Sequence, residues 1–324
     1  MTITRRRFAA TAAAAAALPL IVPRAYAQAM KLRVSTIPII DTAGMQVAIA
    51  KGFYKDEGLE IDTTPTAGGA AGLPALAAGQ VQIAFSNIIS TVLAEKQNLG
   101  FQIISGGSAT ADAPPDLAGL VVKPGAALKT GKDFEGKSIA VNTRNNIIWL
   151  YVRAWVKKTG GDPDKVTYLE VPFPQMIDAV RGGRVDAAFV VEPFLTAGKA
   201  SGQAEIVAWP YSSVQKRIQV AQFVAGKAYI QANAGTIEKF VRAYNKGVDW
   251  MNANKGGDEW ANIIAGYTRL KPEQIKAIAV PVFEKTVDAK GIDETVALMR
   301  DQKMIEGAVD TKAMLYKTAT EAVK

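Results

Sequence analysis

The sequence has 324 residues, 49% hydrophobic and 21% charged, which is globular composition with a length that suits about two domains at ~100 to 200 residues each. It has no cysteine and no histidine, which excludes disulfides, thiol nucleophiles, imidazole acid–base catalysis and Cys/His zinc sites, so we expect neither a metal nor a cofactor. Basic residues outnumber acidic ones by 38 to 30, but four arginines precede residue 28 and the rest are scattered, so no nucleic-acid-binding surface is expected.

The N-terminus has the three parts of an export signal. Arginines at positions 5–7 precede an apolar run over residues 9–22, and an Ala-Tyr-Ala tripeptide ends at Ala27. The arginine pair resembles a twin-arginine signal, with ordinary secretion and a retained membrane anchor as alternatives. An anchor is disfavoured because about 14 apolar residues span only ~21 Å as a helix, short of the ~30 Å hydrocarbon core. The sequence therefore predicts a signal peptide over residues 1–27, cleavage near Ala27 and a periplasmic location.

Short β-branched runs alternate with helical stretches after the export signal. Strands are expected at residues 32–37, 59–63 and 81–85, and helices at 43–50 and 72–78. Strand, helix and strand at this spacing predict right-handed parallel βαβ units. We therefore expect an α/β fold.

An internal repeat indicates that the chain has two similar lobes. The segment ALAAGQVQIAF at residues 75–85 matches AVRGGRVDAAF at residues 179–189, at an offset of 104 residues. Each segment reads as a helix closed by a glycine and followed by a buried strand. A period this long predicts duplicated lobes and not a solenoid.

Two further strands, at residues 117–122 and 218–225, could carry the chain between the lobes. If they do, lobe one comprises residues 28–118 and 219–324, and lobe two comprises residues 119–218. Two connecting strands would form a hinge.

The C-terminal part of the sequence is predicted to be helical. Five residues mark candidate helix starts: Thr236, Asp258, Pro272, Asp293 and Asp310. We expect these helices to pack on lobe one.

Three motifs carry a family resemblance. The segment AIAKGFYKDEGL at residues 48–59, the paired AGQV and GGRVD motifs, and VEPF at residues 191–194 resemble the nitrate, taurine and sulfonate class of ABC solute-binding proteins. That class also includes receptors for thiamine-pathway pyrimidine precursors, and the match covers nearly all of residues 31–324. The resemblance implies a two-lobed periplasmic-binding fold of type II, in which each lobe is a βα sandwich and the ligand binds between the lobes.

The resemblance also implies what the protein does. It would be a monomer that captures a small anionic or zwitterionic organic solute and delivers it to an ABC permease and its ATPase, touching the membrane subunits only peripherally. An enzymatic cousin, the eukaryotic pyrimidine-precursor synthase, depends on histidine and cysteine, which this chain lacks, so we expect no enzyme. The alternatives are a ligand-sensing module for a membrane receptor and an enzyme that uses the carboxylates of Asp41 and Glu192 alone.

Residues 131–138 match the spelling of a phosphate-binding P-loop. A P-loop opens a helix, whereas this segment runs into an expected strand at residues 138–141. A turn is the favoured interpretation.

The loop at residues 142–146 is a candidate binding segment, because ligands of open α/β sheets sit beyond the carboxyl ends of the strands. Thr143 or Asn145 could cap the helix expected at residues 147–158, and Arg144 could pair with a carboxylate or sulfonate. The alternative is a capped surface helix with a solvated arginine.

The remaining candidates also lie beside strand ends. Gly68 and Gly69 could let a ligand approach the backbone, or could form only a flexible loop. Ser86 and Asn87 follow the first repeat strand, and Glu192 follows the second; Glu192 could bind a ligand amine or merely pair with a lysine. Asp41 and Thr42 follow the first strand and could contact a ligand or only cap the helix at residues 43–50, and the weaker candidates are Thr110 and Tyr211.

Overall fold

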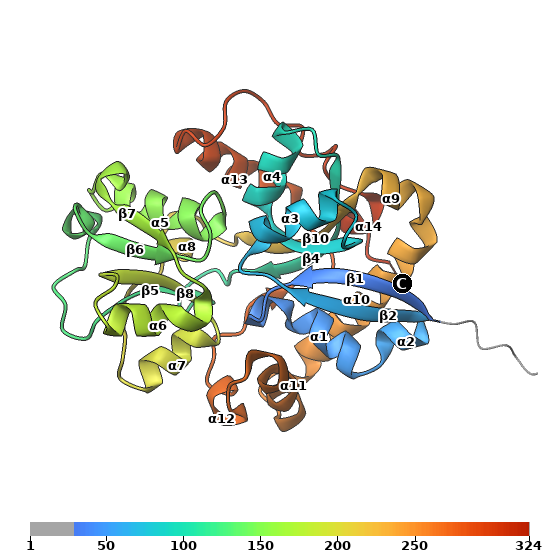
Figure 1. The fold of residues 1–324 in the computed structure, drawn as a ribbon, viewed down its shortest axis with the longest axis horizontal. Coiled ribbons are helices and arrows are strands. Elements are labelled where there is room, and N and C mark those ends of the chain that lie inside the picture. The colour runs from blue at the N-terminus through green and yellow to red at the C-terminus, as the bar shows by residue number, and fades with distance from the viewer. Residues whose placement is uncertain (1–28, 324) are drawn as a thin grey trace, which may run out of the picture.

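The computed structural model describes residues 29–323, so the expected signal peptide, residues 1–27, lies outside the described residues. Figure 1 shows two α/β lobes side by side, each built around its own sheet. The expected α/β fold with two sandwiches is confirmed. In residues 29–323, no helix is both long enough and apolar enough to cross a membrane.

Lobe one contains a six-stranded sheet in the order β11-β4-β10-β3-β1-β2. Its strands are β1 (Met30–Thr36), β2 (Leu59–Pro65), β3 (Ile83–Asn87), β4 (Phe101–Ala109), β10 (Gln219–Gly226) and β11 (Val282–Phe283). Its helices are α1 (Ala43–Ala50), α2 (Phe53–Asp56), α3 (Gly69–Ala77), α4 (Ile88–Lys96), α9 (Lys227–Ala232), α10 (Ala234–Asn254), α11 (Asp258–Thr268), α12 (Pro272–Ile275), α13 (Ala289–Asp301) and α14 (Lys317–Thr320).

Lobe two contains a five-stranded sheet in the order β7-β6-β8-β5-β9. Its strands are β5 (Ala118–Val122), β6 (Ser138–Val141), β7 (Thr167–Glu170), β8 (Ala187–Val191) and β9 (Glu205–Ala208). Its helices are α5 (Ile147–Lys158), α6 (Phe173–Arg181), α7 (Phe194–Ala200) and α8 (Pro210–Val214).

The two sheets share one pattern. In lobe one, β1 pairs in parallel with β2 and β3, and β10 pairs antiparallel with β3 and β4. In lobe two, β6 pairs in parallel with β7 and β8, and β5 pairs antiparallel with β8 and β9. Each sheet therefore directs the carboxyl ends of three parallel strands toward one edge.

The sequence repeat is confirmed as a structural repeat. Every bound of α6 and β8 lies 104 residues after the corresponding bound of α3 and β3. In each unit the turn between helix and strand holds a glycine with positive φ, +67° at Gly79 and +72° at Gly183. That region of φ is open to glycine and strained for most other residues, so both turns need it.

The chain crosses between the lobes at residues 110–117 and 215–218. The two expected strands are present as β5 and β10, but each belongs to a single sheet and the chain crosses just before it. The first crossing contains Pro114 and Pro115, which have no amide hydrogen to extend a ladder. The crossings bind each other, because Thr110 N donates to Ile218 O at 3.0 Å and Ile218 N donates to Thr110 Oγ1 at 2.9 Å.

The tail is helical as expected, but three of the five expected starts are wrong. Helices α11 and α12 begin where predicted. Thr236 lies inside α10, which already begins at Ala234, and Asp293 lies inside α13, which Asp288 caps through its side chain. Asp310 accepts a hydrogen bond in a turn and starts no helix. Residues able to cap are common in this tail, and packing decides which of them do so.

The segment that matches the P-loop pattern forms a turn, as the sequence predicted. Residues Gly131–Phe134 form one 3₁₀ turn, and β6 follows without a helix. Gly131 N donates to Thr159 Oγ1 at 2.7 Å, and a side chain at Gly131 would collide with the carbonyl of Val156. The glycine therefore serves the packing of this turn against the end of α5.

Candidate ligand-binding pocket

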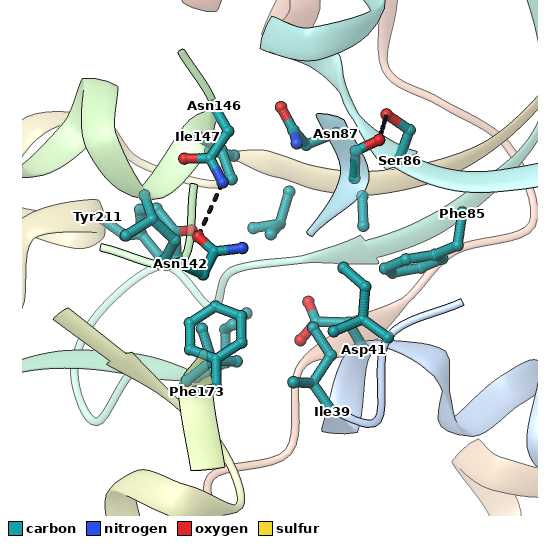
Figure 2. A pocket seen from close by; sticks show the side chains of 17 residues that line it. Ile39, Asp41, Phe85, Ser86, Asn87, Asn142, Asn146, Ile147, Phe173 and Tyr211 are labelled. Atoms are coloured by element: carbon teal, nitrogen blue, oxygen red, sulfur yellow. Dashed lines mark hydrogen bonds between the residues drawn. The ribbon is translucent and has the colours of Figure 1, made fainter. Parts of the chain in front are cut away.

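A small pocket lies between the lobes, at the strand ends that both sheets direct toward each other (Figure 2). Its volume is about 30 Å³, room for about two water molecules. The lobes are thus closed around it. Its lining comprises Ile37, Ile39, Asp41, Gly69, Phe85, Ser86, Asn87, Leu117, Asn142, Asn146, Ile147, Ile148, Phe173, Val191, Tyr211, Val220 and Ala221.

The lobes bind each other directly beside this pocket. From lobe two, Asn142 Nδ2 donates to Ala67 O of lobe one at 3.1 Å. From lobe one, Ile40 N donates to Glu192 O at 3.1 Å and Ala279 N donates to Glu192 Oε1 at 3.2 Å. These contacts hold the closed arrangement, so opening the pocket must break them.

Asp41 supplies the carboxylate of the pocket. It lies in the 3₁₀ turn Ile40–Thr42, just after β1, and is only 2% exposed. Ser108 Oγ donates to its Oδ1 at 2.5 Å, while Oδ2 has no hydrogen-bond partner in the described part of the chain. Burial raises the pKa of Asp41 to about 6, against the hydrogen bond from Ser108, which lowers it. Figure 2 shows the carboxylate pointing into the pocket.

Two asparagines of lobe two face Asp41 across the pocket (Figure 2). Asn146 caps α5 through Oδ1, which accepts from Trp149 N at 3.1 Å, and its Nδ2 donates to Asn142 Oδ1 at 2.8 Å. Asn142 in turn binds lobe one. The pair therefore joins a helix start in lobe two to the interface between the lobes.

Three more polar residues complete the lining. Ser86 Oγ donates to Gly69 O at 3.3 Å, and Asn87 Oδ1 caps α4 by accepting from Ser90 N at 3.0 Å. The ring of Tyr211 packs in the core of lobe two, 5.0 Å from that of Phe189 between centroids. Its buried hydroxyl has no partner within residues 29–323, which leaves it available to a ligand.

The pocket carries negative charge and no opposing cation. None of its described lining residues is lysine or arginine. A second buried acid, Asp116 in the first crossing, lies close enough to raise the pKa of Asp41 further, and burial raises its own pKa to about 6. The pocket is therefore suited to ligand groups that donate hydrogen bonds or carry positive charge.

Five of the twelve candidate residues from the sequence line the pocket: Asp41, Gly69, Ser86, Asn87 and Tyr211. Seven do not: Thr42, Gly68, Thr110, Thr143, Arg144, Asn145 and Glu192. Most of these seven residues make hydrogen bonds to other groups of the chain. Thr42 Oγ1 donates to the carbonyls of Ile37 and Ile39, Thr110 joins the crossings, and Thr143 Oγ1 accepts from Asn146.

Arg144 is exposed and points away from the pocket, contrary to the expected anion clamp. Its Nη2 donates to Tyr168 O at 2.7 Å, and its backbone N donates to Glu170 Oε1 at 2.7 Å. Asn145 beside it has a positive φ of 53°, and Asn146 takes the capping role expected of Thr143 or Asn145. The guanidinium thus fastens the loop to β7.

We expect Arg144→Ala to change the affinity for pocket ligands by less than about twofold, because an exposed arginine outside the pocket contributes little. Calorimetric titration of wild type and variant checks this, with a thermal melt to confirm that both are folded. A loss of tenfold or more would show that the guanidinium reaches the pocket.

Glu192 acts between the lobes and not in the pocket. Its carboxylate accepts from Thr196 Oγ1 at 2.6 Å, from Thr196 N at 3.0 Å and from Ala279 N of lobe one. Burial raises its pKa, and these hydrogen bonds oppose the rise. Other groups thus hold the Glu192 carboxylate, and it does not line the pocket that Asp41 lines.

Sequence reasoning named the loop at residues 142–146 but did not single out Asn142 or Asn146 in it, and it missed Phe85 and Phe173 of the lining. Asn142 is the first residue after β6, the position that the strand-end rule favours, and it could have been found by applying that rule strictly. Phe173 opens α6 after β7, and no sequence pattern separated it from an ordinary core residue.

A wider groove of about 620 Å³ opens between the lobes next to the pocket. Lobe two lines it with α6 and α7, and lobe one lines it with the end of α11 and the following loop. Pro38 lies in the groove, between the pocket residues Ile37 and Ile39.

Comparisons with known proteins agree with this architecture. Residues 39–256 match the family model described as NMT1/THI5 like. YtlA of Bacillus subtilis (strain 168), whose name describes a binding protein, is 23% identical over 218 residues, 67% of this chain and 64% of that protein. A protein of Brachyspira hyodysenteriae, whose name describes a periplasmic binding protein of an ABC transporter, is 23% identical over 239 residues, 70% of this chain and 66% of that protein. The matches thus span just under two thirds of each relative.

The solved structure of the alkanesulfonate-binding protein SsuA from Xanthomonas axonopodis pv. citri, bound to MOPS, is similar with a TM-score of 0.76. The alignment covers 90% of this chain and 99% of that one at 16% identity. At this identity the likeness shows the two-lobed fold alone.

Proposed function

Because the chain belongs to the NMT1/THI5-like family, we propose that it is the solute-binding component of an ABC importer. It captures a small organic solute between its lobes and delivers it to the permease. The observation that carries this proposal is the position of the pocket, at strand ends contributed by both lobes and beside direct contacts between them.

Capture requires that the lobes open and close. A solute that contacts both lobes stabilises the closed form by its differential affinity, so binding shifts the population toward closure. The crossings at residues 110–117 and 215–218 are the hinge, since they are the two points where the chain passes between the sheets. No bond of the solute is broken, and the protein acts without catalysis.

Export and docking complete the proposal. The leader at residues 1–27 directs the protein to the periplasm by the twin-arginine route. There it works as a monomer, and the closed form contacts the permease at the membrane surface, while the ATPase acts from the other side.

A thermal-shift screen of amines, amino acids, nitrogen heterocycles, carboxylates, sulfonates and nitrate tests this function. A true solute at 100 times its Kd should add about 2.7 kcal/mol to the free energy of unfolding. The same compound should reduce the radius of gyration in small-angle scattering, because it favours closure. A compound that raises the melting temperature without compacting the protein would contradict capture between lobes, and so would a screen without any hit.

A further inference from the structure

We infer that the pocket binds a ligand through a positively charged nitrogen, of the ammonium or amidinium type, held against the Asp41 carboxylate. This inference rests on the proposed function and names the chemical class of the solute. It departs from the anionic solute expected from the sequence.

The first observation is an acceptor without a donor. Asp41 lines the pocket and is 2% exposed; Ser108 binds one of its oxygens, and the other is buried without a partner in the described residues. A buried carboxylate oxygen without a partner is costly, because it has lost water and gained nothing in return. A cationic N–H in the pocket would supply the missing hydrogen bond and the missing charge together.

The second observation concerns the groups that face Asp41. Ser108 and Asp116 shift the pKa of Asp41, and the charge of Asp41 raises the pKa values of Tyr211, Tyr244 and Tyr267. None of these groups carries a positive charge, and no lysine or arginine lines the described pocket. Asp41 therefore has no cation of the protein to neutralise it, and an anionic ligand would meet like charge without a counter-ion.

The third observation is the shape of the remaining lining. Tyr211 presents a buried hydroxyl without a partner, which can accept a second N–H of the same ligand group. Apart from Ser86 and three asparagines, the rest of the lining is apolar, with Phe85, Phe173 and isoleucines at positions 37, 39, 147 and 148. The expected ligand thus has a cationic head that lies in the pocket, and a hydrocarbon or ring body would need the pocket to widen toward the adjoining groove.

Matched probes decide the charge class. The probes form triads, which are sets of three compounds with the same body (ethyl, pentyl or benzyl). Within a triad, one compound carries an ammonium head, one a hydroxyl head and one a sulfonate head. For every body that binds, we expect the ammonium probe to bind at least about tenfold more tightly than the alcohol, and the sulfonate to bind least. Calorimetric titration at pH 7 measures the order.

Variants assign the preference to one carboxylate. Asp41→Asn keeps the size and the acceptor for Ser108 but removes the charge, so it should abolish the preference for ammonium. Tyr211→Phe should weaken ammonium binding without changing the order of the three heads. Asp56→Asn is the matched control, because Asp56 is exposed on α2, and it should bind like wild type. Thermal melts verify that each variant is folded.

The pH dependence gives an independent readout. Burial holds the pKa of Asp41 at about 6. A cation binds the ionised carboxylate, so protonation of Asp41 competes with cation binding as the pH falls below 6. Ammonium affinity should therefore fall by about tenfold between pH 7 and pH 5 in wild type and stay level in Asp41→Asn.

The outcomes separate this inference from the proposed function. A sulfonate that binds as tightly as its ammonium partner, or ammonium binding unchanged in Asp41→Asn, would overturn the cation site while leaving solute capture intact. A hit from the wider screen that carries no N–H group would do the same. If neither the triads nor the screen yields any ligand, the proposed function itself fails.

Discussion

Gly68→Ala should lower the affinity for pocket ligands by roughly 10- to 100-fold while leaving each lobe folded. In the closed form, a Cβ at Gly68 would lie 2.6 Å from Asn142 Nδ2 and 2.9 Å from Thr143 Oγ1, both of the other lobe. Real side chains do not approach so closely, so the side chains of Asn142 and Thr143 must shift or the lobes must separate, and either change disturbs the bond from Asn142 to Ala67. Overpacking of this kind costs about 1 to 3 kcal/mol, which sets the expected loss.

The open form should tolerate the methyl group. Gly68 has an extended backbone with φ of −177°, which any residue adopts, so the substitution acts on closure and not on local strain. Titration and small-angle scattering measure the effect, and Gly235→Ala is the matched control because a Cβ there meets nothing within 4 Å. Wild-type affinity in Gly68→Ala would mean that ligand binding does not need this closure.

Asp41→Asn should raise the free energy of unfolding at pH 7 by about 2 to 3 kcal/mol when no ligand is added. The pKa of Asp41 rises from 3.8 to about 6 on folding because the carboxyl group is buried. Between these values the native state binds more protons than the unfolded state, so stability is fully present below pH 3.8 and falls as the pH rises to about 6. A neutral amide of the same shape avoids that loss.

Denaturant unfolding at several pH values checks this prediction. The gain of Asp41→Asn over wild type should shrink toward zero below pH 4, where both side chains are neutral, and Asp56→Asn should show no gain at any pH. An equal stability of wild type and Asp41→Asn at pH 7 would argue that the carboxylate is well solvated. A gain in stability paired with a loss of binding would mark Asp41 as a residue kept for its ligand.

The local pattern of the sequence was sufficient for most elements. Helices at residues 43–50 and 147–158 were predicted with the bounds that α1 and α5 have. The repeat identified both copies of the helix and strand unit, because short-range periodicity and turn glycines govern them. The strand-end rule also identified the region of the pocket.

The direction of individual side chains was beyond that reasoning. Arg144 and Asn142 are two residues apart, yet the Arg144 guanidinium binds the carbonyl of Tyr168 within its own lobe, whereas Asn142 binds Ala67 of the other lobe. Glu192 binds Ala279, which lies 87 residues away in the chain, and Asp41 binds Ser108, 67 residues away. No local pattern reveals which distant donor will reach a carboxylate.

The place of β10 in its sheet has a consequence for how the protein is made. β10 lies between β3 and β4, yet residue 219 leaves the ribosome 110 residues after residue 109, which ends β4. At about 5 to 20 residues per second this is a wait of roughly 5 to 20 seconds. Lobe two, whose strands all fall within residues 118–208, can fold during that wait. The facing edges of β3 and β4 stay unpaired until β10 arrives, and unpaired edges are templates for aggregation. The nascent chain is therefore most vulnerable while its second lobe is already complete.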